Sequence, residues 1–361
     1  MNVKHLLLCL CLCLCLCLGL TACDQAPPTD QGFAGLGSAS DGFAQVTPGR
    51  TFAFPVDHGA HPDYRIEWWY LTANLQDEQG QQYGVQWTLF RSALAPGSTA
   101  AGWSNRNLWI GHAGLTSATA HFASQTLARG GVGQAGVQAQ PFNAYIDDWY
   151  LRSRPGADNA LTAMALHARG EGFAYKLQLD SSLPLVLQGQ QGYSRKSEQG
   201  QASYYYSQPF FTAHGELQIG DRTVKVSGRA WLDREWSSQP LGADQSGWDW
   251  FSLHLEGGRQ LMLFRLRGSQ DFYSGNWIEA DGRSQPLHGS DLTIKPTSFS
   301  TVAGRKVPTQ WSVKVASKGL DIQVNAVNPN AWMNLGTPYW EGPVGVEGSQ
   351  TGDGYLEMTG Y

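Results

Sequence analysis

The sequence predicts an all-β protein, and its composition, its strand periodicity and an internal repeat are the observations that predict it. The 361-residue chain contains 43 Gly, 14 Trp, 14 Tyr and 14 Phe, and 15% of its residues are charged. Aromatic residues favour strands, whereas charged helix formers are scarce. Apolar residues alternate with polar ones at 173–179, 224–232, 311–315 and 320–324, without a long helical period. Short alternating strands separated by turns favour antiparallel barrels or sandwiches.

Two segments of the chain match each other position by position. Residues 68–75 read WWYLTANL and residues 248–255 read WDWFSLHL. Each segment is followed by a turn with Gly and by a second strand, which ends in Leu-Phe-Arg at 89–91 and at 263–265. The repeat predicts two related β domains that each open with the same hairpin. We therefore expect one domain at 51–240 and a second at 241–361.

The N-terminus has the features of a secretion signal. Lys4 provides a short positive region, and the apolar run from Leu6 to Leu18 is shorter than the roughly 20 residues of a membrane-spanning helix. The following Leu-Thr-Ala-Cys at 20–23 resembles the lipobox of bacterial lipoproteins. It predicts a signal peptide at 1–22, lipidation of Cys23 and anchoring to the inner or outer membrane on the periplasmic side. An ordinary secretory signal with an incidental cysteine is the alternative.

The remaining composition limits what the mature chain can be. All six cysteines lie at or before Cys23, so the folded part needs no disulfide. Residues 23–50 are rich in small and polar residues and predict a flexible tether. A formal charge of −5 argues against nucleic-acid binding, which requires a basic surface.

The two hairpins each place an acid and an arginine on their apolar face. If a three-residue loop with Gly80 joins the first pair of strands, Glu67 lies opposite Arg91, and Asp249 lies opposite Arg265 in the second. An unpaired charge on an apolar face costs several kcal/mol, so both pairs are predicted to form. They are either structural ion pairs or part of a polar site inside a binding cavity.

Several motifs resemble the AttH and hydroxyneurosporene synthase (CrtC) family. The resemblance extends from about residue 50 to the C-terminus, and the motifs that carry it are FPVDH at 54–58, EWWY at 67–70, QWTLFR at 86–91, AWLDREW at 230–236, GWDWF at 247–251 and GYLEMTGY at 354–361. It implies two lipocalin-like antiparallel β-barrels in tandem and a large apolar ligand. Family members include proteins encoded with ABC transporter components and carotenoid 1,2-hydratases.

Two functions follow from the resemblance. The first is binding of a hydrophobic, lipid-like or isoprenoid-like molecule by a membrane-anchored protein that is accessory to an ABC transporter permease. Aromatic residues are the predicted ligand-binding set: Trp69, Tyr70, Trp87, Tyr205, Trp231, Trp236, Trp248 and Trp250. Of the run Tyr204-Tyr205-Tyr206, one or two rings are expected in the core, because alternate residues of a strand face opposite sides.

The second function is that of a lyase on an apolar alkene. Protonating an isolated double bond requires a strong acid in a dry pocket, with aromatic faces near the cation. The resemblance assigns this role to Asp233, in a pattern where Trp231 replaces the family tyrosine. Arg234 is expected to lower the pKa of Asp233, which a general acid would not want. Structural, binding and catalytic roles for Asp233 therefore stay open.

Signatures of other enzyme classes are missing. The sequence contains no nucleophile elbow, no phosphate-binding loop and no His-Glu-x-x-His motif, and no cofactor is predicted. Asp57, His58, His61 and Asp63 are spaced so that they could hold a metal ion, but a polar surface loop is the preferred interpretation. No metal site is predicted.

Overall fold

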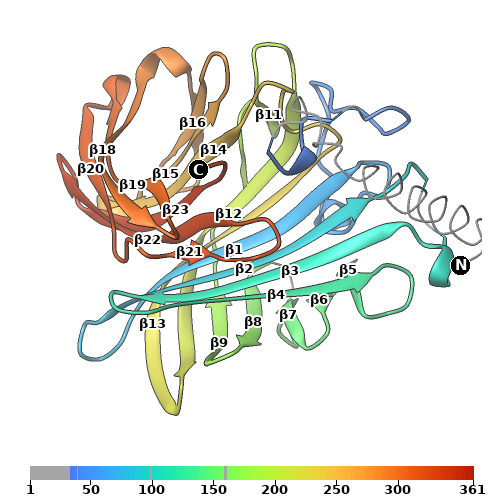
Figure 1. The fold of residues 1–361 in the computed structure, drawn as a ribbon, viewed down its shortest axis with the longest axis horizontal. Coiled ribbons are helices and arrows are strands. Elements are labelled where there is room, and N and C mark those ends of the chain that lie inside the picture. Colours follow the sequence, from blue (N-terminus) through green and yellow to red (C-terminus); the bar gives the residue numbers. More distant parts are fainter. Residues whose placement is uncertain (1–32, 39, 98–99, 158–160) are drawn as a thin grey trace, which may run out of the picture.

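The computed structural model describes residues 33–38, 40–97, 100–157 and 161–361, which form strands and short 3-10 turns (Figure 1). The all-β prediction is confirmed, because neighbouring strands pair antiparallel throughout these residues. The predicted signal peptide and Cys23 lie outside the described residues. Among the described residues, no helix has the length and apolarity to cross a membrane.

The strands are β1 (Ile66–Gln76), β2 (Gln82–Ala93), β3 (Asn107–Ser117), β4 (His121–Arg129), β5 (Ala135–Ala139), β6 (Phe142–Ile146), β7 (Trp149–Ser153), β8 (Ala163–Gly170), β9 (Phe173–Asp180), β10 (Val186–Leu187), β11 (Tyr193–Arg195), β12 (Ala202–Ile219), β13 (Arg222–Ser237), β14 (Gly247–Leu255), β15 (Gln260–Arg267), β16 (Phe272–Ile278), β17 (Ser284–Leu287), β18 (Leu292–Val302), β19 (Arg305–Val315), β20 (Leu320–Ala326), β21 (Trp332–Met333), β22 (Tyr339–Gly348) and β23 (Gly352–Met358). The 3-10 turns are η1 (Phe33–Gly35), η2 (Val56–His58), η3 (Gly102–Ser104), η4 (Glu256–Gly258), η5 (Gly289–Asp291) and η6 (Ala316–Lys318).

The strands divide into two sheets that follow each other in sequence. The first sheet contains β1 to β13 in the order β4-β3-β2-β1-β13-β12-β9-β8-β7-β6-β5, and β10 and β11 also pair with β12. The second contains β14 to β23 in the order β17-β16-β15-β14-β23-β22-β20-β19-β18, with β21 paired to β22. Each sheet curves around its own apolar core, and the second sheet packs against β1 to β4 of the first (Figure 1).

The hairpin register that the sequence predicts is the observed one. Glu67 is paired with Arg91 in β1 and β2, and Asp249 is paired with Arg265 in β14 and β15. Gly80 has a φ of 78°, in the left-handed region that the short loop requires. The repeated segments are the first strands of their sheets, and the strands of one sheet end at Ser237 while those of the next begin at Gly247.

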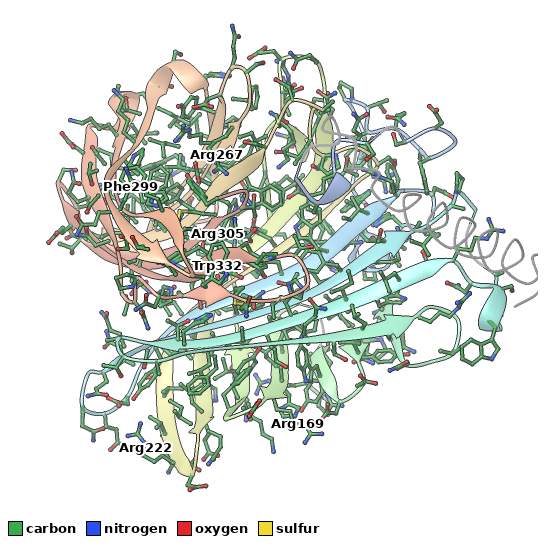
Figure 2. All side chains as sticks on the ribbon, viewed as in Figure 1. Arg169, Arg222, Arg267, Phe299, Arg305 and Trp332 are labelled. Atoms are coloured by element: carbon green, nitrogen blue, oxygen red, sulfur yellow. The ribbon has the colours of Figure 1, made fainter. Side chains whose placement is uncertain are left out.

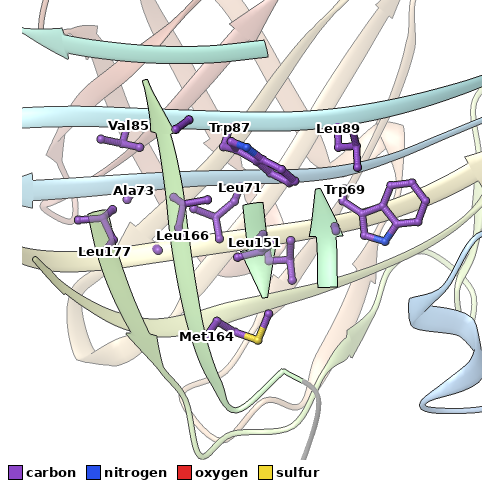
Figure 3. Packing of buried hydrophobic residues seen from close by; sticks show 14 of the residues in the cluster. Trp69, Leu71, Ala73, Val85, Trp87, Leu89, Leu151, Met164, Leu166 and Leu177 are labelled. Atoms are coloured by element: carbon purple, nitrogen blue, oxygen red, sulfur yellow. The ribbon is translucent and has the colours of Figure 1, made fainter. Parts of the chain in front are cut away.

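The interior of the first sheet shows how alternation builds the core. Trp69, Leu71 and Ala73 of β1 lie beside Leu89, Trp87 and Val85 of β2, and all six point toward the strands that carry Leu151, Leu166 and Leu177 (Figure 3). All are buried, so their burial is the main favourable contribution to folding of this sheet. By contrast, Arg169 and Arg222 lie at the end of the first sheet that is remote from the second (Figure 2).

The tether prediction is wrong for the part of 23–50 that the structure describes. Thr47 N donates to Tyr204 Oη at 3.0 Å, Ala44 N donates to Asp63 O at 2.9 Å, and Ser40 is buried. Arg65 holds the segment by donating from Nη2 to Leu36 O at 3.0 Å. Small and polar residues suggested a linker, but several of their backbone groups are hydrogen-bonded to distant parts of the chain, which composition cannot show.

Candidate functional site

A cavity of about 110 Å³ lies between the two sheets rather than inside either core. The faces that enclose it follow from strand alternation. In β1 the odd-numbered residues face the core of the first sheet, so Ile66, Trp68 and Tyr70 face the second sheet. In β14, Phe251 and Leu253 lie in the second core, which turns Trp248 and Trp250 toward the first sheet. The full lining is Leu36, Ile66, Trp68, Tyr70, Phe90, Lys196, Tyr205, Asp233, Glu235, Pro240, Leu241, Trp248, Trp250, Phe264, Leu266 and Glu357.

Asp233 lines this cavity and accepts hydrogen bonds from three side chains. It lies on β13 and is buried, and its Oδ1 accepts hydrogen bonds from Ser207 Oγ at 2.5 Å and from Trp231 Nε1 at 2.6 Å. Its Oδ2 accepts from Tyr205 Oη at 2.7 Å, and Trp250 Nε1 of the second sheet donates to that tyrosine oxygen at 3.2 Å. The carboxyl is thus fixed by both sheets.

Burial raises the pKa of Asp233 to about 7, although its hydrogen bonds from Ser207, Tyr205 and Trp231 act in the opposite direction. The nearby charge of Glu235 adds to the increase. Near neutral pH, a large fraction of Asp233 therefore carries a proton, as a general acid requires.

The expected effect of Arg234 on Asp233 is wrong. Arg234 is adjacent in sequence, but alternation sends its side chain to the opposite face of β13, where it pairs with Glu67. Asp233 consequently forms no salt bridge with any residue that the structure describes, whereas Arg234 pairs with Glu67. This chain has Trp231 where the family pattern has a tyrosine, and Tyr205 of β12 supplies a tyrosine hydroxyl that donates to the carboxyl of Asp233.

Three further charged groups complete the cavity wall. Trp248 Nε1 donates to Glu357 Oε1 at 2.8 Å, and Glu357 is half-buried on β23. Lys196 Nζ lies 2.8 Å from Glu235 Oε1 and 4.3 Å from the centroid of the Phe264 ring. Lys196 was not found from the sequence, because no periodicity or motif marks an isolated lysine in a loop. Glu357 lies in a family motif but carried no separate signal.

A second cavity of about 300 Å³ adjoins the first. The two share the lining residues Leu36, Ile66, Phe90, Trp248 and Glu357. The first cavity alone is smaller than the roughly 300–1,000 Å³ of ordinary small-molecule sites, whereas the second reaches the lower end of that range.

The predicted ligand-binding aromatics divide between this site and the cores. Tyr70, Tyr205, Trp248 and Trp250 line the first cavity, and Trp231 lies behind Asp233 as a hydrogen-bond donor. Trp69, Trp87 and Trp236 are buried in the core of the first sheet, so a ligand-binding role for them is corrected. They lie on strand positions that alternate away from the second sheet.

The acid of the first hairpin has two buried arginine partners. Glu67 contacts both Arg91 and Arg234, and Arg91 Nη1 also donates to Asn107 Oδ1 at 2.8 Å. Burial opposes ionisation of Glu67, but the positive charges of Arg234 and Arg91 hold its pKa well below the usual range. None of the three lines the inter-sheet cavity. This arrangement therefore has the geometry of a structural network in the first core.

The acid of the second hairpin has its predicted partner, Arg265, and a second, closer one. Asp249 Oδ1 lies 2.6 Å from Arg267 Nη1 and accepts from Tyr361 Oη at 2.8 Å, whereas Arg265 Nη1 is 3.7 Å from Oδ2. Arg265 also donates from Nε to Asp271 Oδ2 at 2.8 Å. Register alone placed Arg265 opposite Asp249, but Arg267, two residues along the same face, reaches the carboxylate more closely.

The segment at 57–63 is not the polar surface loop that the sequence suggested. Asp57 and His58 are buried, and Asp57 accepts from Arg50 and from Ala53 N, both at 2.7 Å. Burial lowers the pKa of His58 to about 4, and its Nδ1 lies 2.6 Å from Tyr206 Oη. No group of three or more potential metal ligands is found in the part of the chain that the structure describes.

Known proteins with this architecture are recognisable in sequence and in structure. The AttH-like family model matches residues 45–361. The crystal structure of a protein from Nitrosomonas europaea assigned to AttH superposes with a TM-score of 0.77 at 31% identity, covering 88% of this chain and all of that one. No curated protein matches the sequence.

Two more distant structures share the fold. Kievitone hydratase from Nectria haematococca superposes with a TM-score of 0.66 at 13% identity, covering 88% of this chain and 96% of its own. CghA, solved with Sch210972, superposes with a TM-score of 0.53 at 12% identity, covering 92% and 97%. The predicted pair of lipocalin-like antiparallel sheets is confirmed by the Nitrosomonas structure. With its family model and this relative covering most of the sequence, the chain belongs to the AttH-like family.

Proposed function

We propose that the protein binds an apolar molecule between its two sheets and protonates it through Asp233. The observation that carries this proposal is a carboxyl group with a pKa raised to about 7 in the wall of an aromatic cavity. A protein that only carried an apolar molecule would gain nothing from a buried ionisable group, because burying a polar group is costly. Strongly shifted pKa values gather at functional sites.

The geometry suggests which atoms take part. Oδ1 of Asp233 already accepts two hydrogen bonds, whereas Oδ2 faces Tyr205, which lines the cavity. The acidic proton is therefore placed on Oδ2, from which it passes to an alkene carbon directly or through the Tyr205 hydroxyl. The rings of Tyr205, Trp248 and Trp250 line the same cavity, and aromatic faces would stabilise a carbocation formed there.

Isotope exchange tests this function. The purified protein is incubated in D2O with isoprenoid alkenes that have isolated trisubstituted double bonds, namely farnesol, geranylgeraniol and squalene. We expect deuterium to enter the recovered alkene or an alcohol product, at a rate that falls as the pH rises above about 7, where Asp233 loses its proton. Mass spectrometry measures the incorporation. Binding of these alkenes without any deuterium uptake would contradict the role of Asp233 as an acid and would indicate a protein that only carries the ligand.

The N-terminal sequence favours a second candidate function, that of a membrane-anchored carrier. The lipobox-like LTAC at 20–23 would fix the protein to the periplasmic side of the inner or outer membrane. There the inter-sheet cavity would receive a hydrophobic molecule from, or present it to, an ABC transporter permease. The anchor supports this role because apolar ligands partition into the membrane.

The anchor has its own test. Replacing Cys23 by Ser is expected to abolish labelling by radioactive palmitate and to release a soluble or unprocessed form, because only the thiol accepts the lipid. Fractionation of cells and autoradiography measure both effects. Undiminished labelling of the Cys23→Ser protein would refute lipidation at this residue and, with it, the anchored carrier.

A further inference from the structure

The geometry points to Glu357 as a second catalytic residue of this cavity, which takes up a proton from water while Asp233 gives one to the alkene. This inference rests on the proposed function and specifies its reaction as the addition of water across an isolated double bond. The two carboxyls come from different sheets, Asp233 from β13 and Glu357 from β23, and both line the same cavity.

The placement of Glu357 follows from the pairing of the second sheet. Glu357 is the cross-strand neighbour of Trp250, and Trp250 Nε1 reaches the Tyr205 oxygen that donates to Asp233. Asp233 and Glu357 are therefore related through Trp250, by hydrogen bonds through Tyr205 on one side and by strand pairing on the other. Glu357 also belongs to the lining that the first and second cavities share.

The carboxyl of Glu357 is fixed by one hydrogen bond and remains accessible to a water molecule in the cavity. Trp248 Nε1 donates to Oε1 at 2.8 Å, and the side chain is half-buried, with surface that opens into the cavities. Its cross-strand neighbour Glu341 differs, because Glu341 is buried, accepts from Tyr70 Oη and lines neither cavity. Glu357 is therefore the acid of the second sheet that can meet a water molecule beside the ligand.

The electrostatic surroundings couple the two acids. Burial raises the pKa of Glu357 to about 7; the Trp248 hydrogen bond opposes this, and the charges of Asp233 and Glu235 reinforce it. Since ionisation of one acid disfavours ionisation of the other, one proton shared between them is favoured near neutral pH. The titratable groups that face Glu357 across the two cavities or from the neighbouring strand are Arg65, Tyr70, His112, Lys196, Tyr205, Asp233, Glu235, Tyr339 and Glu341.

The reaction balances with water as the co-reactant. The π electrons of the alkene form a C–H bond with the Asp233 proton, which leaves Asp233 as a carboxylate and a cation on the neighbouring carbon. The oxygen of water bonds to that carbon, and one water proton passes to the Glu357 carboxylate. The product is a tertiary alcohol. Return of the proton from Glu357 to Asp233 restores the starting state without any oxidant or reductant.

The substitution Glu357→Gln separates the addition of water from the protonation of the alkene. Gln keeps an oxygen that accepts from Trp248, and it removes the proton acceptor. With the same three alkenes in D2O containing ¹⁸O water, we expect deuterium exchange to persist, because Asp233 can take back the proton it gave. Formation of the ¹⁸O-labelled alcohol should fall by about 10²–10⁴-fold, the usual contribution of a general base. Glu341→Gln is the matched control and should form the alcohol at the wild-type rate.

The outcomes distinguish this inference from the proposed function. Alcohol formation that survives Glu357→Gln, or deuterium exchange lost together with it, would overturn the role of Glu357 while Asp233 stays the acid. If the wild-type protein incorporates neither deuterium nor ¹⁸O, the proposed function fails. The electrostatic coupling between Asp233 and Glu357 is then tested separately, by infrared titration of their carboxyl bands. There, Asp233→Asn should lower the pKa of Glu357 because a neighbouring negative charge is gone, and an unchanged pKa would refute the paired acids.

Discussion

Asp233→Asn is expected to lower the rate of deuterium transfer to the alkene probes by about 10²–10⁴-fold, the contribution of a positioned general acid. The amide has the shape of the carboxyl, and its oxygen can still accept from Ser207 and Trp231. The site should therefore keep its geometry and lose only its proton. Ligand affinity measured by quenching of tryptophan fluorescence should stay within a few-fold of the wild-type value.

The same substitution has a predictable effect on stability. The pKa of Asp233 is raised in the folded protein from 3.8 to about 7, so the folded state holds a proton that the unfolded state has lost. The stabilisation that comes from this bound proton is therefore fully present below about pH 4, and it is lost as the pH rises toward 7. Asn has no such dependence. As the pH rises from 5 to 8, the free energy of unfolding of the wild type should therefore fall relative to that of the variant. The expected change is on the order of a few kcal/mol.

Asp353→Asn serves as the control for both measurements. Asp353 lies on β23, outside both cavities, and its Oδ2 is 2.6 Å from Arg229 Nη2. It should leave the deuterium transfer rate unchanged. Denaturant titrations at pH 5 and pH 8 measure stability. Loss of fold in Asp233→Asn at pH 5, where Asp353→Asn stays folded, would show that this carboxyl is structural.

The largest effect on folding is expected from Glu67→Gln, which should cost about 3–5 kcal/mol, as for other broken buried ion pairs. The carboxylate is buried between Arg91 and Arg234, and a neutral amide would leave two buried cations without a counter-charge. Because the pKa of Glu67 is held well below its usual range, this stabilisation is present above about pH 4.5 and fades as the pH falls.

An exposed ion pair provides the matched control for Glu67→Gln. Arg169 Nε and Asp148 Oδ2 lie 2.6 Å apart, with side-chain exposures of 67% and 48%. Asp148→Asn should therefore change the free energy of unfolding by no more than about 1 kcal/mol. Chemical denaturation at pH 7 measures both variants. A cost for Glu67→Gln as small as that of the control would mean that the buried network does not stabilise the fold.

Alternation and repetition in the sequence were sufficient to predict the sheets and the hairpin register. A strand exposes alternate residues to opposite faces, so Glu67 could be placed with Trp69 and opposite Arg91 without coordinates. The same rule predicted that some rings of Tyr204-Tyr205-Tyr206 belong to the core. Tyr204 and Tyr206 do, and Tyr205 faces the second sheet.

Which face of each strand binds a ligand was decided only by the packing of one sheet on the other. Both faces of β1 are rich in aromatic residues, so the sequence could not distinguish Trp69, in the core, from Tyr70, at the cavity. The sequence places Arg234 beside Asp233, yet the pleat separates them, and the pKa of Asp233 rises because folding buries its carboxyl away from water. Lys196 and Glu357 join the site from segments far apart in the chain. Strand periodicity is a local property that the sequence carries, whereas the burial and neighbours of a charge depend on contacts between distant segments, which arise only when the chain is folded.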